Sequence, residues 1–311
     1  MNLTDPIFSD EIKAREHFEA IRWPNGPYCP HCGETERLSR LNGKSHRVGL
    51  IQCNACNEAF TVTVGTVMER SHVPLNKWAL AFKLMCSSKK GVSAHQLHRT
   101  LDVTYKTAWF MAHRVREAMR PLDAEAGGQL GGTNKVVEVD ETYVGGRARN
   151  RKNHVPPKEA VVALVERDGR VRSRHVPTVN GQTLRPILKE EINKASYVMT
   201  DESPIYPSIA SEFGGHGTVN HSIEEYVRGG FWHTNTVESY FSILKRGVIG
   251  TYHHVSAEHL KRYLGEFDFR HNERIALGVN DDGRTEKAIK GASGKRLTYQ
   301  RAGRGAEEVP F

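Results

Sequence analysis

Residues 135–146, with the sequence KVVEVDETYVGG, decide the fold of this 311-residue chain. Apolar and polar side chains alternate along them, with Val137 and Val139 on one face, and this period of two predicts a β-strand. The apolar part of the strand ends at Asp140. A carboxylate at such a position can emerge where the strand ends.

The sequence after this strand predicts an α/β domain. Residues 160–179 form two strands around an Asp-Gly hairpin turn, and residues 181–194 have helical apolar spacing. A short apolar strand then ends at Asp201, and a long helix begins near Asn235. This order predicts a mixed sheet flanked by helices.

Three acidic residues are the candidate catalytic groups: Asp140, Asp201 and Glu238. The two aspartates each close an apolar strand, so both can emerge at neighbouring strand ends, and the helix that carries Glu238 can approach them. Lys245 lies seven residues after Glu238, two turns along the same helix face. A single aspartate at a strand end is more often a turn former, so the hypothesis depends on the ordered set.

Three converging carboxylates repel one another unless cations lie between them. Oxygen ligands suit Mg²⁺ or Mn²⁺, and two such ions stabilise the attacking and leaving oxygens of a phosphoryl displacement. We therefore expect Asp140, Asp201 and Glu238 to bind two catalytic metal ions.

The cysteines predict a second metal site. They form two C-x-x-C pairs separated by 20 residues, Cys29 with Cys32 and Cys53 with Cys56. This spacing is typical of tetrahedral zinc in a ribbon, with a hairpin turn at Asn42-Gly43 and a further strand over residues 58–68. Disulfides or redox chemistry are the alternative, but disulfides need an oxidising compartment and the N-terminal sequence has no apolar signal core.

Two helices with a short turn between them are predicted after the ribbon. Ser93 and Thr104 are each placed to cap a helix, with the turn at residues 101–103. The pattern favours a helix-turn-helix, whose second helix would bind double-stranded DNA; an ordinary helical hairpin in a core is the alternative. The candidate DNA contacts are Tyr105, Lys106, Thr107 and Arg114.

The net charge of +8 belongs to one segment. Residues 29–120 contain 14 Lys or Arg and 6 Asp or Glu, whereas the rest of the chain contains 30 of each. An excess of this kind in the ribbon and helix-turn-helix favours a polyanionic partner, although a solvated basic surface is the alternative.

The composition excludes several classes of protein. Hydrophobic residues make up 38% and charged residues 26%, as in ordinary globular proteins, so the chain is not disordered throughout and is neither collagen nor coiled coil. No uncharged run is long enough to cross a bilayer. We expect no membrane partner and a cytoplasmic, nucleoid-associated protein.

The chain resembles bacterial insertion-sequence transposases of the DDE type, in the ISXO2-like group with an N-terminal zinc ribbon. The resemblance covers roughly residues 20–275 and rests on CPHC, CNAC, VEVDETYVGG, VMTDES, VNHSIEEYV and HTNTVESYFSILKRGVIGTYHHV. It implies a ribonuclease-H-like catalytic fold, with Asp140 and Asp201 as the first two catalytic acids. Members have Glu or Asn as the third residue, and this chain offers both Glu238 and Asn235.

We favour Glu238 as the ligand, with Asn235 as either the formal third residue or a supporting contact. The resemblance also implies that Lys245 and Arg246 contact DNA phosphates near the cleavage site; a solvated helix face is the alternative. Three histidines are candidates to line the site, although each alone is more often structural: His216, His221 and His233. Trp232 could stack on a base, but core packing is favoured.

The implied reaction is DNA transposition. Water activated by the metal ions cleaves a phosphodiester at the element end, and the 3′-hydroxyl so released attacks target DNA without a covalent protein intermediate. Pairing two DNA ends implies a homo-oligomer. The alternatives are a DNA-binding protein with a zinc ribbon or a nuclease, either derived from a transposase but without transposition activity.

The sequence predicts five parts along the chain. They are an N-terminal segment with the zinc ribbon (1–70), a helix-turn-helix segment (71–120), a linker (121–134), the catalytic domain (135–278) and a flexible C-terminal tail (279–311).

Overall fold

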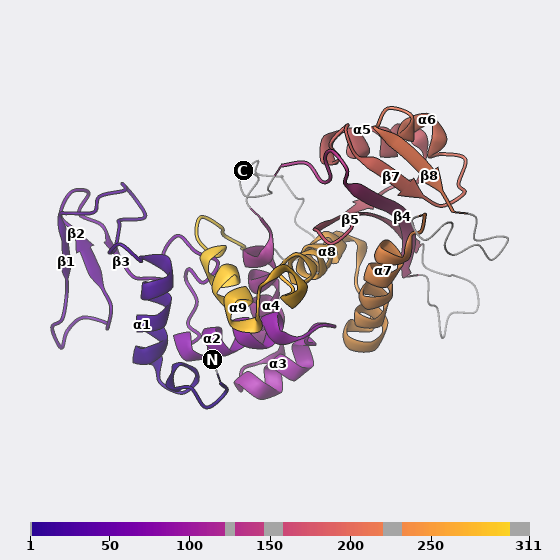
Figure 1. The fold of residues 1–311 in the computed structure, drawn as a ribbon. Coiled ribbons are helices and arrows are strands. Elements are labelled where there is room, and N and C mark those ends of the chain that lie inside the picture. The colour runs from indigo at the N-terminus through magenta and orange to yellow at the C-terminus, as the bar shows by residue number, and fades with distance from the viewer. Residues whose placement is uncertain (1, 122–127, 146–157, 220–231, 299–311) are drawn as a thin grey trace. The chain divides into compact units, whose positions relative to one another are not determined.

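The protein is described by a computed structural model, which covers residues 2–121, 128–145, 158–219 and 232–298 (Figure 1). The chain divides into two compact units. Unit 1 consists of Met1–Ala81, Ala94–Ala118 and Ile289–Phe311, and unit 2 consists of Phe82–Ser93 and Met119–Ala288.

Unit 1 begins with a short 3-10 helix, η1 (Pro6–Phe8), and helix α1 (Glu11–Arg22). The Asp10 carboxylate caps α1, because it accepts hydrogen bonds from the backbone N–H groups of its first turn. A small antiparallel sheet follows, in the order β1 (Leu38–Arg40), β2 (Ile51–Cys53) and β3 (Ala59–Phe60).

The ribbon differs from the prediction in two places. Residues 41–50 join β1 to β2 as a loop closed by the bond from Leu41 N–H to the Leu50 carbonyl (3.0 Å), so Asn42-Gly43 is not the hairpin turn. The strand predicted over residues 58–68 ends at Phe60. Beyond it the chain turns, because Gly65 has a left-handed backbone (φ +71°) and the Thr66 hydroxyl donates to the Thr63 carbonyl (2.7 Å).

Three helices follow the ribbon: α2 (Leu75–Ser87), α3 (Ala94–Leu101) and α4 (Tyr105–Met119). The turn between α3 and α4 has the predicted length. Thr104 Oγ1 accepts a hydrogen bond from Thr107 N–H (3.2 Å), which confirms the predicted cap of α4. Leu97 and Leu101 of α3 and Val115 of α4 are buried, so these helices pack through apolar faces.

Unit 2 contains a five-stranded mixed sheet, in the order β6-β5-β4-β7-β8. Its strands are β4 (Val136–Gly145), β5 (Lys158–Glu166), β6 (Val171–Val176), β7 (Tyr197–Thr200) and β8 (Gly215–Thr218). β4, β5 and β6 pair antiparallel, whereas β4 with β7 and β7 with β8 pair parallel. The predicted strand around Asp140 is therefore the central strand.

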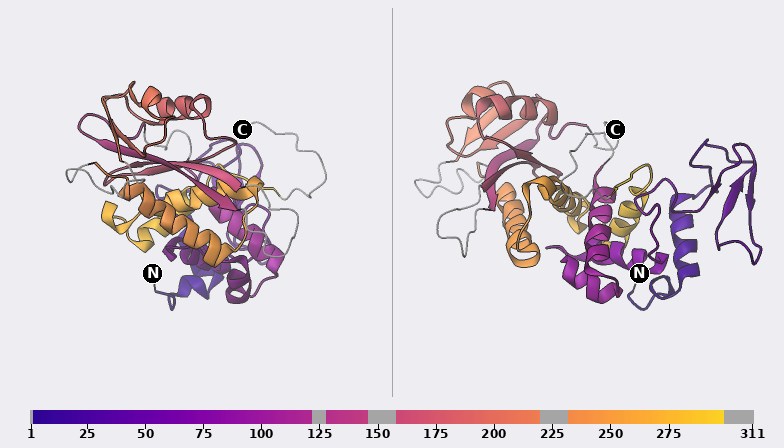
Figure 2. Two further views of the ribbon diagram at one scale, coloured as in Figure 1. Left: turned by 90° about the vertical axis from the view of Figure 1, so that its right-hand side faces the viewer. Right: turned by 180° about the vertical axis from the view of Figure 1, so that it is seen from behind.

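Helices cover both faces of this sheet (Figures 1 and 2). α5 (Gly181–Glu191) and α6 (Pro207–Ala210) pack on the face that carries Val137 and Val139 of β4. α7 (Asn235–Gly247) and α8 (Ala257–Asn272) pack on the opposite face, which carries Val144. A π-helical turn, η4 (Val248–Tyr252), continues α7. The mixed sheet flanked by helices is thus as predicted.

The described part of the predicted linker is not a linker. Leu130 is fully buried, its backbone N–H donates to the Glu191 carbonyl (2.7 Å), and its carbonyl accepts from Asn193 N–H (2.8 Å). Gly132 N–H donates to the Ser196 hydroxyl (2.8 Å). Residues 128–134 therefore belong to unit 2, although their glycine-rich sequence is typical of a linker.

The prediction of a flexible tail from residue 279 is wrong for its first part. Residues Asp281–Lys290 form helix α9, preceded by the 3-10 helix η5 (Ile275–Leu277). Arg284 is 7% exposed and donates to the Cys86 carbonyl (2.7 Å), and Ala288 is fully buried. The helix is held by polar contacts with residues far away in the sequence. Such contacts leave no helical spacing of apolar residues from which α9 could be predicted. Residues 299–311 lie outside the described residues.

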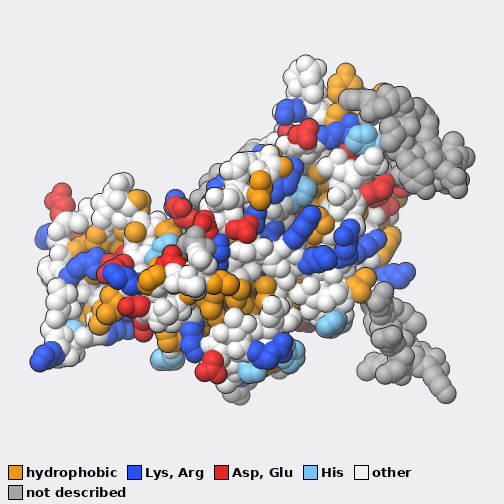
Figure 3. Space-filling model, turned by 60° about the horizontal axis from the view of Figure 1, so that its bottom comes forward, with side chains coloured by type: hydrophobic (Ala, Val, Ile, Leu, Met, Phe, Trp, Pro, Cys, Tyr) orange, Lys and Arg blue, Asp and Glu red, His pale blue; other side chains and the backbone are white. Residues whose placement is uncertain are grey.

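Lysine and arginine side chains gather toward the right of the face drawn in Figure 3. Within the described ranges, no helix combines the length and the apolar character needed to cross a membrane. The motif predicted over 219–227 lies almost wholly outside the described residues, as does His221.

Candidate functional site

The four cysteines of the two C-x-x-C pairs come together in unit 1. Their sulfur atoms all lie within 4.8 Å of one another: those of Cys29, Cys32, Cys53 and Cys56. The Sγ atoms of Cys29 and Cys56 are 3.7 Å apart, as are those of Cys32 and Cys53. Four sulfurs bound at about 2.3 Å to one tetrahedral ion would lie about 3.8 Å apart, so the cluster fits zinc.

The same backbone turn follows each cysteine pair. Gly33 and Asn57, the residues after each second cysteine, both have left-handed backbones, with φ of +80° and +59°. Cys29 N–H donates to the Glu34 carbonyl (2.8 Å), and Cys53 N–H donates to the Glu58 carbonyl (2.9 Å). Local sequence at each pair is therefore enough to shape half of the cluster.

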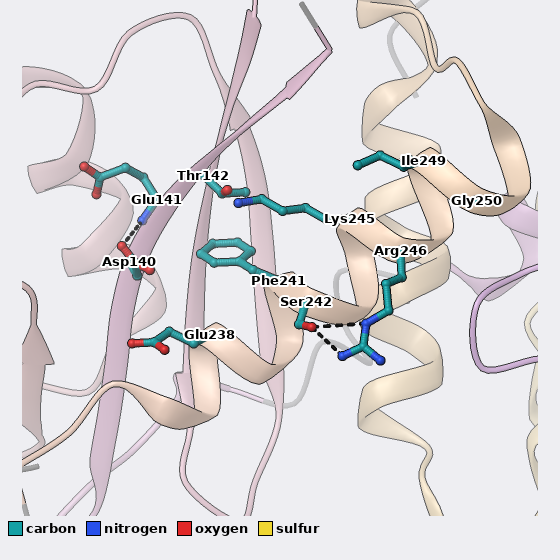
Figure 4. A pocket seen from close by; sticks show the side chains of 10 residues that line it. All are labelled: Asp140, Glu141, Thr142, Glu238, Phe241, Ser242, Lys245, Arg246, Ile249 and Gly250. Carbon is teal, nitrogen blue, oxygen red and sulfur yellow. Dashed lines mark hydrogen bonds between the residues drawn. The ribbon is translucent and has the colours of Figure 1, made fainter. Parts of the chain in front are cut away.

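A second site lies in unit 2, where α7 packs beside β4 (Figure 4). It is a cavity of about 590 Å³. Its lining residues come from β4, α7 and η4: Asp140, Glu141, Thr142, Glu238, Phe241, Ser242, Lys245, Arg246, Ile249 and Gly250. The cavity therefore joins two of the three predicted acids to both predicted phosphate-binding residues.

One face of α7 supplies most of this wall. Glu238, Phe241 and Lys245 are spaced by three and four residues, which places them one above another on a helix. In Figure 4 the Glu238 carboxylate lies at the Asp140 end of the cavity and the Lys245 side chain extends toward Thr142. The predicted shared face of Glu238 and Lys245 is confirmed.

Asp140 is a carboxylate of this cavity whose pKa is strongly raised by its surroundings. Its Oδ1 accepts a hydrogen bond from Glu141 N–H (2.8 Å). Burial, followed by the negative charges of Glu141, Asp201 and Glu238, raises the pKa of Asp140 to about 7. A carboxylate surrounded by other negative charges in this way attracts a cation, because the positive charge would offset their repulsion.

Asp201 follows β7, the parallel neighbour of β4. Its carboxylate accepts from Ser203 N–H (3.1 Å), and its charge contributes to the raised pKa of both Asp140 and Glu141. It is not among the cavity-lining residues. Over the described ranges, the four cysteines alone bring three or more potential ligand atoms within 4.8 Å of one another, so the three carboxylates share a region without meeting at ligand distance.

Asn235 and Glu238 occupy different positions relative to the cavity. Asn235 is the exposed first residue of α7 and does not line the cavity. Glu238 lines it, and its Oε1 accepts a hydrogen bond from the Thr234 hydroxyl (2.9 Å). Thr234 is the residue that precedes α7. Its side chain thus orients the Glu238 side chain instead of capping the backbone of α7.

His216, His233 and Trp232 lie around the site and do not line the cavity. His233 Nδ1 is 3.2 Å from a carboxylate oxygen of Glu138, and His216 Nε2 is 3.0 Å from the Thr200 hydroxyl, beside Asp201. Trp232 is half-buried and packs against Gly217 of β8 so closely that a Cβ there would lie 2.0 Å from its ring.

Two further acidic residues of β4 were not predicted. Glu141 lines the cavity, and the hydroxyl of the fully buried Tyr206 donates to its carboxylate. Glu138 is fully buried and contacts the start of α7. The sequence contains one signal for a role of Glu138: the alternation of β4 places it on the same face as Asp140. The hydrogen-bond partners of Glu138 and Glu141 lie tens of residues away along the chain.

The predicted DNA contacts of α4 divide into two groups. Tyr105 is 45% exposed and Lys106 is also exposed, at the start of the helix. Thr107 is engaged in the cap with Thr104. Arg114 is half-buried, donates to the Glu69 carbonyl (3.1 Å) and lies over the Phe110 ring. Its contacts are within unit 1, so the prediction for Arg114 finds no support in its position.

These features define a class: an α/β protein with an N-terminal four-cysteine ribbon and a carboxylate cavity on a central strand. A family model described as the ISXO2-like transposase domain matches residues 129–272, and a transposase zinc-ribbon domain matches residues 9–59. The chain is 31% identical over 282 residues to an uncharacterized protein in transposable element ISH50 of Halobacterium salinarum, covering 85% of this chain and 91% of that protein. The chain therefore belongs to the ISXO2-like transposase family, as the motifs predict.

A solved structure also shows similarity. A chain in the crystal structure of a pre-cleavage Mos1 transpososome is 11% identical, covers 66% of this chain and 75% of its own, and has a TM-score of 0.23. A likeness at this level supports no inference about the site.

Proposed function

We propose that this protein is a transposase that cleaves DNA at element ends and joins the released strand to target DNA. One observation carries the proposal: within the segment that matches the transposase domain, Asp140, Glu238 and Lys245 face one cavity. The sheet order, with three antiparallel strands and two parallel ones, supports the ribonuclease-H-like interpretation.

The donor set of the cavity fits Mg²⁺ or Mn²⁺. Asp140 and Glu238 offer carboxylate oxygens beside the cavity, Asp201 lies near enough to raise the pKa of Asp140, and oxygen is the ligand atom these ions prefer. These three residues would hold two ions. When bound, the ions supply charge stabilisation of the attacking and leaving oxygens of a phosphoryl transfer.

The chain's own residues would bind and orient the DNA. Lys245 and Arg246 are exposed on the same helix face as Glu238 and would contact phosphates that flank the scissile bond. Tyr105 and Lys106, exposed at the start of α4, would contact the element end. The four-cysteine cluster would hold structural zinc and so fold the ribbon.

The reaction would occur in two displacements at phosphorus. Hydrolysis at the element end would release a 3′-hydroxyl, and this hydroxyl would then displace a phosphodiester oxygen of target DNA. Glu238 is the third acid of this proposal, because it lines the cavity and Asn235 does not. Joining two element ends would require at least a homodimer.

The test supplies donor DNA with 3′-hydroxyl element ends and a target plasmid. We expect a joined product with the native protein in Mg²⁺, and none with Asp201→Asn, while gel-shift affinity for the element end is unchanged. Strand transfer by Asp201→Asn would contradict the catalytic assignment. Cleavage without any joined product would favour the nuclease alternative, and binding without either would favour the DNA-binding alternative.

A further inference from the structure

Glu138 is a fully buried carboxylate on the central strand β4. One oxygen accepts hydrogen bonds from the backbone N–H groups of Thr236 (2.8 Å) and Val237 (3.0 Å). The other accepts from the Thr236 hydroxyl (2.9 Å) and from Arg167 Nε (2.7 Å). A buried charge with this many donors is fully compensated, so its position is strongly determined.

The backbone groups that Glu138 binds are the second and third N–H groups of α7. A side chain at the helix start normally accepts from these groups, but Thr234 makes no such bond. Glu138 therefore caps α7 from another element, and its charge also interacts favourably with the positive end of the helix.

Arg167 closes the same contact from the other side. Its Nε donates to Glu138, its Nη2 donates to the His233 carbonyl (2.8 Å), and its backbone N–H donates to the Val136 carbonyl of β4 (3.0 Å). Glu138 and Arg167 thus tie the chain just before α7, and the first turn of α7, to β4.

The two elements held together are those that carry the proposed catalytic acids. Asp140 lies two residues after Glu138 on the same face of β4, about 7 Å along the strand. Glu238 directly follows Val237, whose N–H Glu138 accepts. A loose first turn of α7 would therefore move Glu238 relative to Asp140, and an error of about 1 Å is enough to impair a metal or catalytic site.

We propose that Glu138 is a positioning residue of the active site: it caps α7 from β4 and so sets Glu238 opposite Asp140. The effect of Glu138 on catalysis rests on the proposed function. The cap that Glu138 makes on α7 rests on the contacts alone.

The experiment compares Glu138→Gln with a matched control, Glu191→Gln. Glu191 is also buried, at 2% exposure, and is paired with Arg172 and Arg174, but it lies at the end of α5 on the other side of the sheet. The double variant Glu138→Gln with Arg167→Gln is made in parallel, because it removes both charges and does not leave Arg167 unpaired if the single variant folds poorly.

Three quantities are measured in the full-length, zinc-loaded protein. They are hydrogen exchange of the Thr236 and Val237 amides, the Kd for Mn²⁺, and the Mg²⁺ concentration for half-maximal strand transfer. In folded Glu138→Gln or the double variant, we expect exchange at both amides and both metal parameters to rise about tenfold or more. We expect Glu191→Gln to lower the melting temperature without these changes.

Metal parameters that match those of the native protein, or that change equally in Glu191→Gln, would overturn the positioning role. If the native protein shows no metal-dependent cleavage, the proposed function fails by itself. The cap is then tested by hydrogen exchange alone. Loss of protection at the Thr236 and Val237 amides in Glu138→Gln, but not in Glu191→Gln, supports the cap, and retained protection refutes it.

Discussion

The four-cysteine cluster and the carboxylate cavity differ in how the chain brings their ligands together. Each half of the cysteine cluster is made by four consecutive residues and one turn, and all four sulfurs lie within 4.8 Å. The acids come from positions 140, 201 and 238 and are placed by a sheet and by a helix capped from β4. The first site is determined locally, whereas the second depends on tertiary packing.

The largest expected effect is the loss of the ribbon without zinc. A zinc-selective chelator, or Cys53→Ser, should unfold residues 29–60, because metal binding supplies about 10 kcal/mol or more of folding free energy in such modules. Amide NMR signals of the ribbon should lose dispersion while those of β4–β8 remain. Cys86→Ala is the control and should keep one zinc per chain; a folded metal-free ribbon would refute the site.

The next effect separates Glu238 from Asn235. Glu238→Gln should lower the strand-transfer rate by about 10³-fold, because a lost metal ligand removes several kcal/mol of transition-state stabilisation. Asn235→Ala should lower it far less, since Asn235 does not line the cavity. Single-turnover assays in Mg²⁺ measure both, and the reverse order would make Asn235 the third catalytic residue.

The pH dependence of stability tests the crowding around Asp140. Its pKa is raised from 3.8 to about 7, so the folded state holds a proton that the unfolded state has released. Stability without divalent cations should therefore fall as pH rises from about 4 to 7. Asp140→Asn should lack this loss and be more stable at pH 8, by up to about 4 kcal/mol.

Equilibrium denaturation at pH 5 and pH 8 measures this difference. At pH 5, inside the range over which this stability is lost, the native protein should be less stable than Asp140→Asn by only about 2 kcal/mol, against up to about 4 kcal/mol at pH 8. Added Mg²⁺ should stabilise the native protein at pH 8 and leave Asp140→Asn unchanged. An equal pH dependence in both proteins would show that Asp140 is not in the crowded site described.

The smallest effect concerns DNA affinity. Lys245→Ala should weaken binding to element-end DNA by about 1 kcal/mol and reduce the slope of log K against log salt by about 1, as expected for one lost phosphate contact. Lys189→Ala is the control, because Lys189 lies on α5 and is paired with Glu212. Salt titrations by fluorescence anisotropy distinguish the two variants, and equal slopes would remove Lys245 from the DNA contacts.

The same comparison explains what the sequence could predict. The cysteine spacing, the strand that carries Asp140 and the shared helix face of Glu238 and Lys245 are periodic or local signals, and the structure contains all of them. The Glu138 cap and the contact between Tyr206 and Glu141 join residues tens of positions apart. No period or spacing encodes such contacts.

The errors have the same cause. Residues 128–134 and helix α9 look polar or glycine-rich, yet both are held by specific hydrogen bonds to distant partners. Arg114 is predicted as a DNA contact because it lies in a basic helix, and that assignment stays a prediction; its guanidinium donates one hydrogen bond to the Glu69 carbonyl and lies over the Phe110 ring. Composition describes an average surface and does not reveal these partners.

The central claim is that the acids around β4 and α7 form a divalent-cation site. Mn²⁺ binding to the zinc-loaded protein, followed by electron paramagnetic resonance, tests it most directly. We predict two bound ions per native chain and a loss of binding in both Asp140→Asn and Glu238→Gln. Unchanged Mn²⁺ stoichiometry and affinity in Asp140→Asn would contradict the claim.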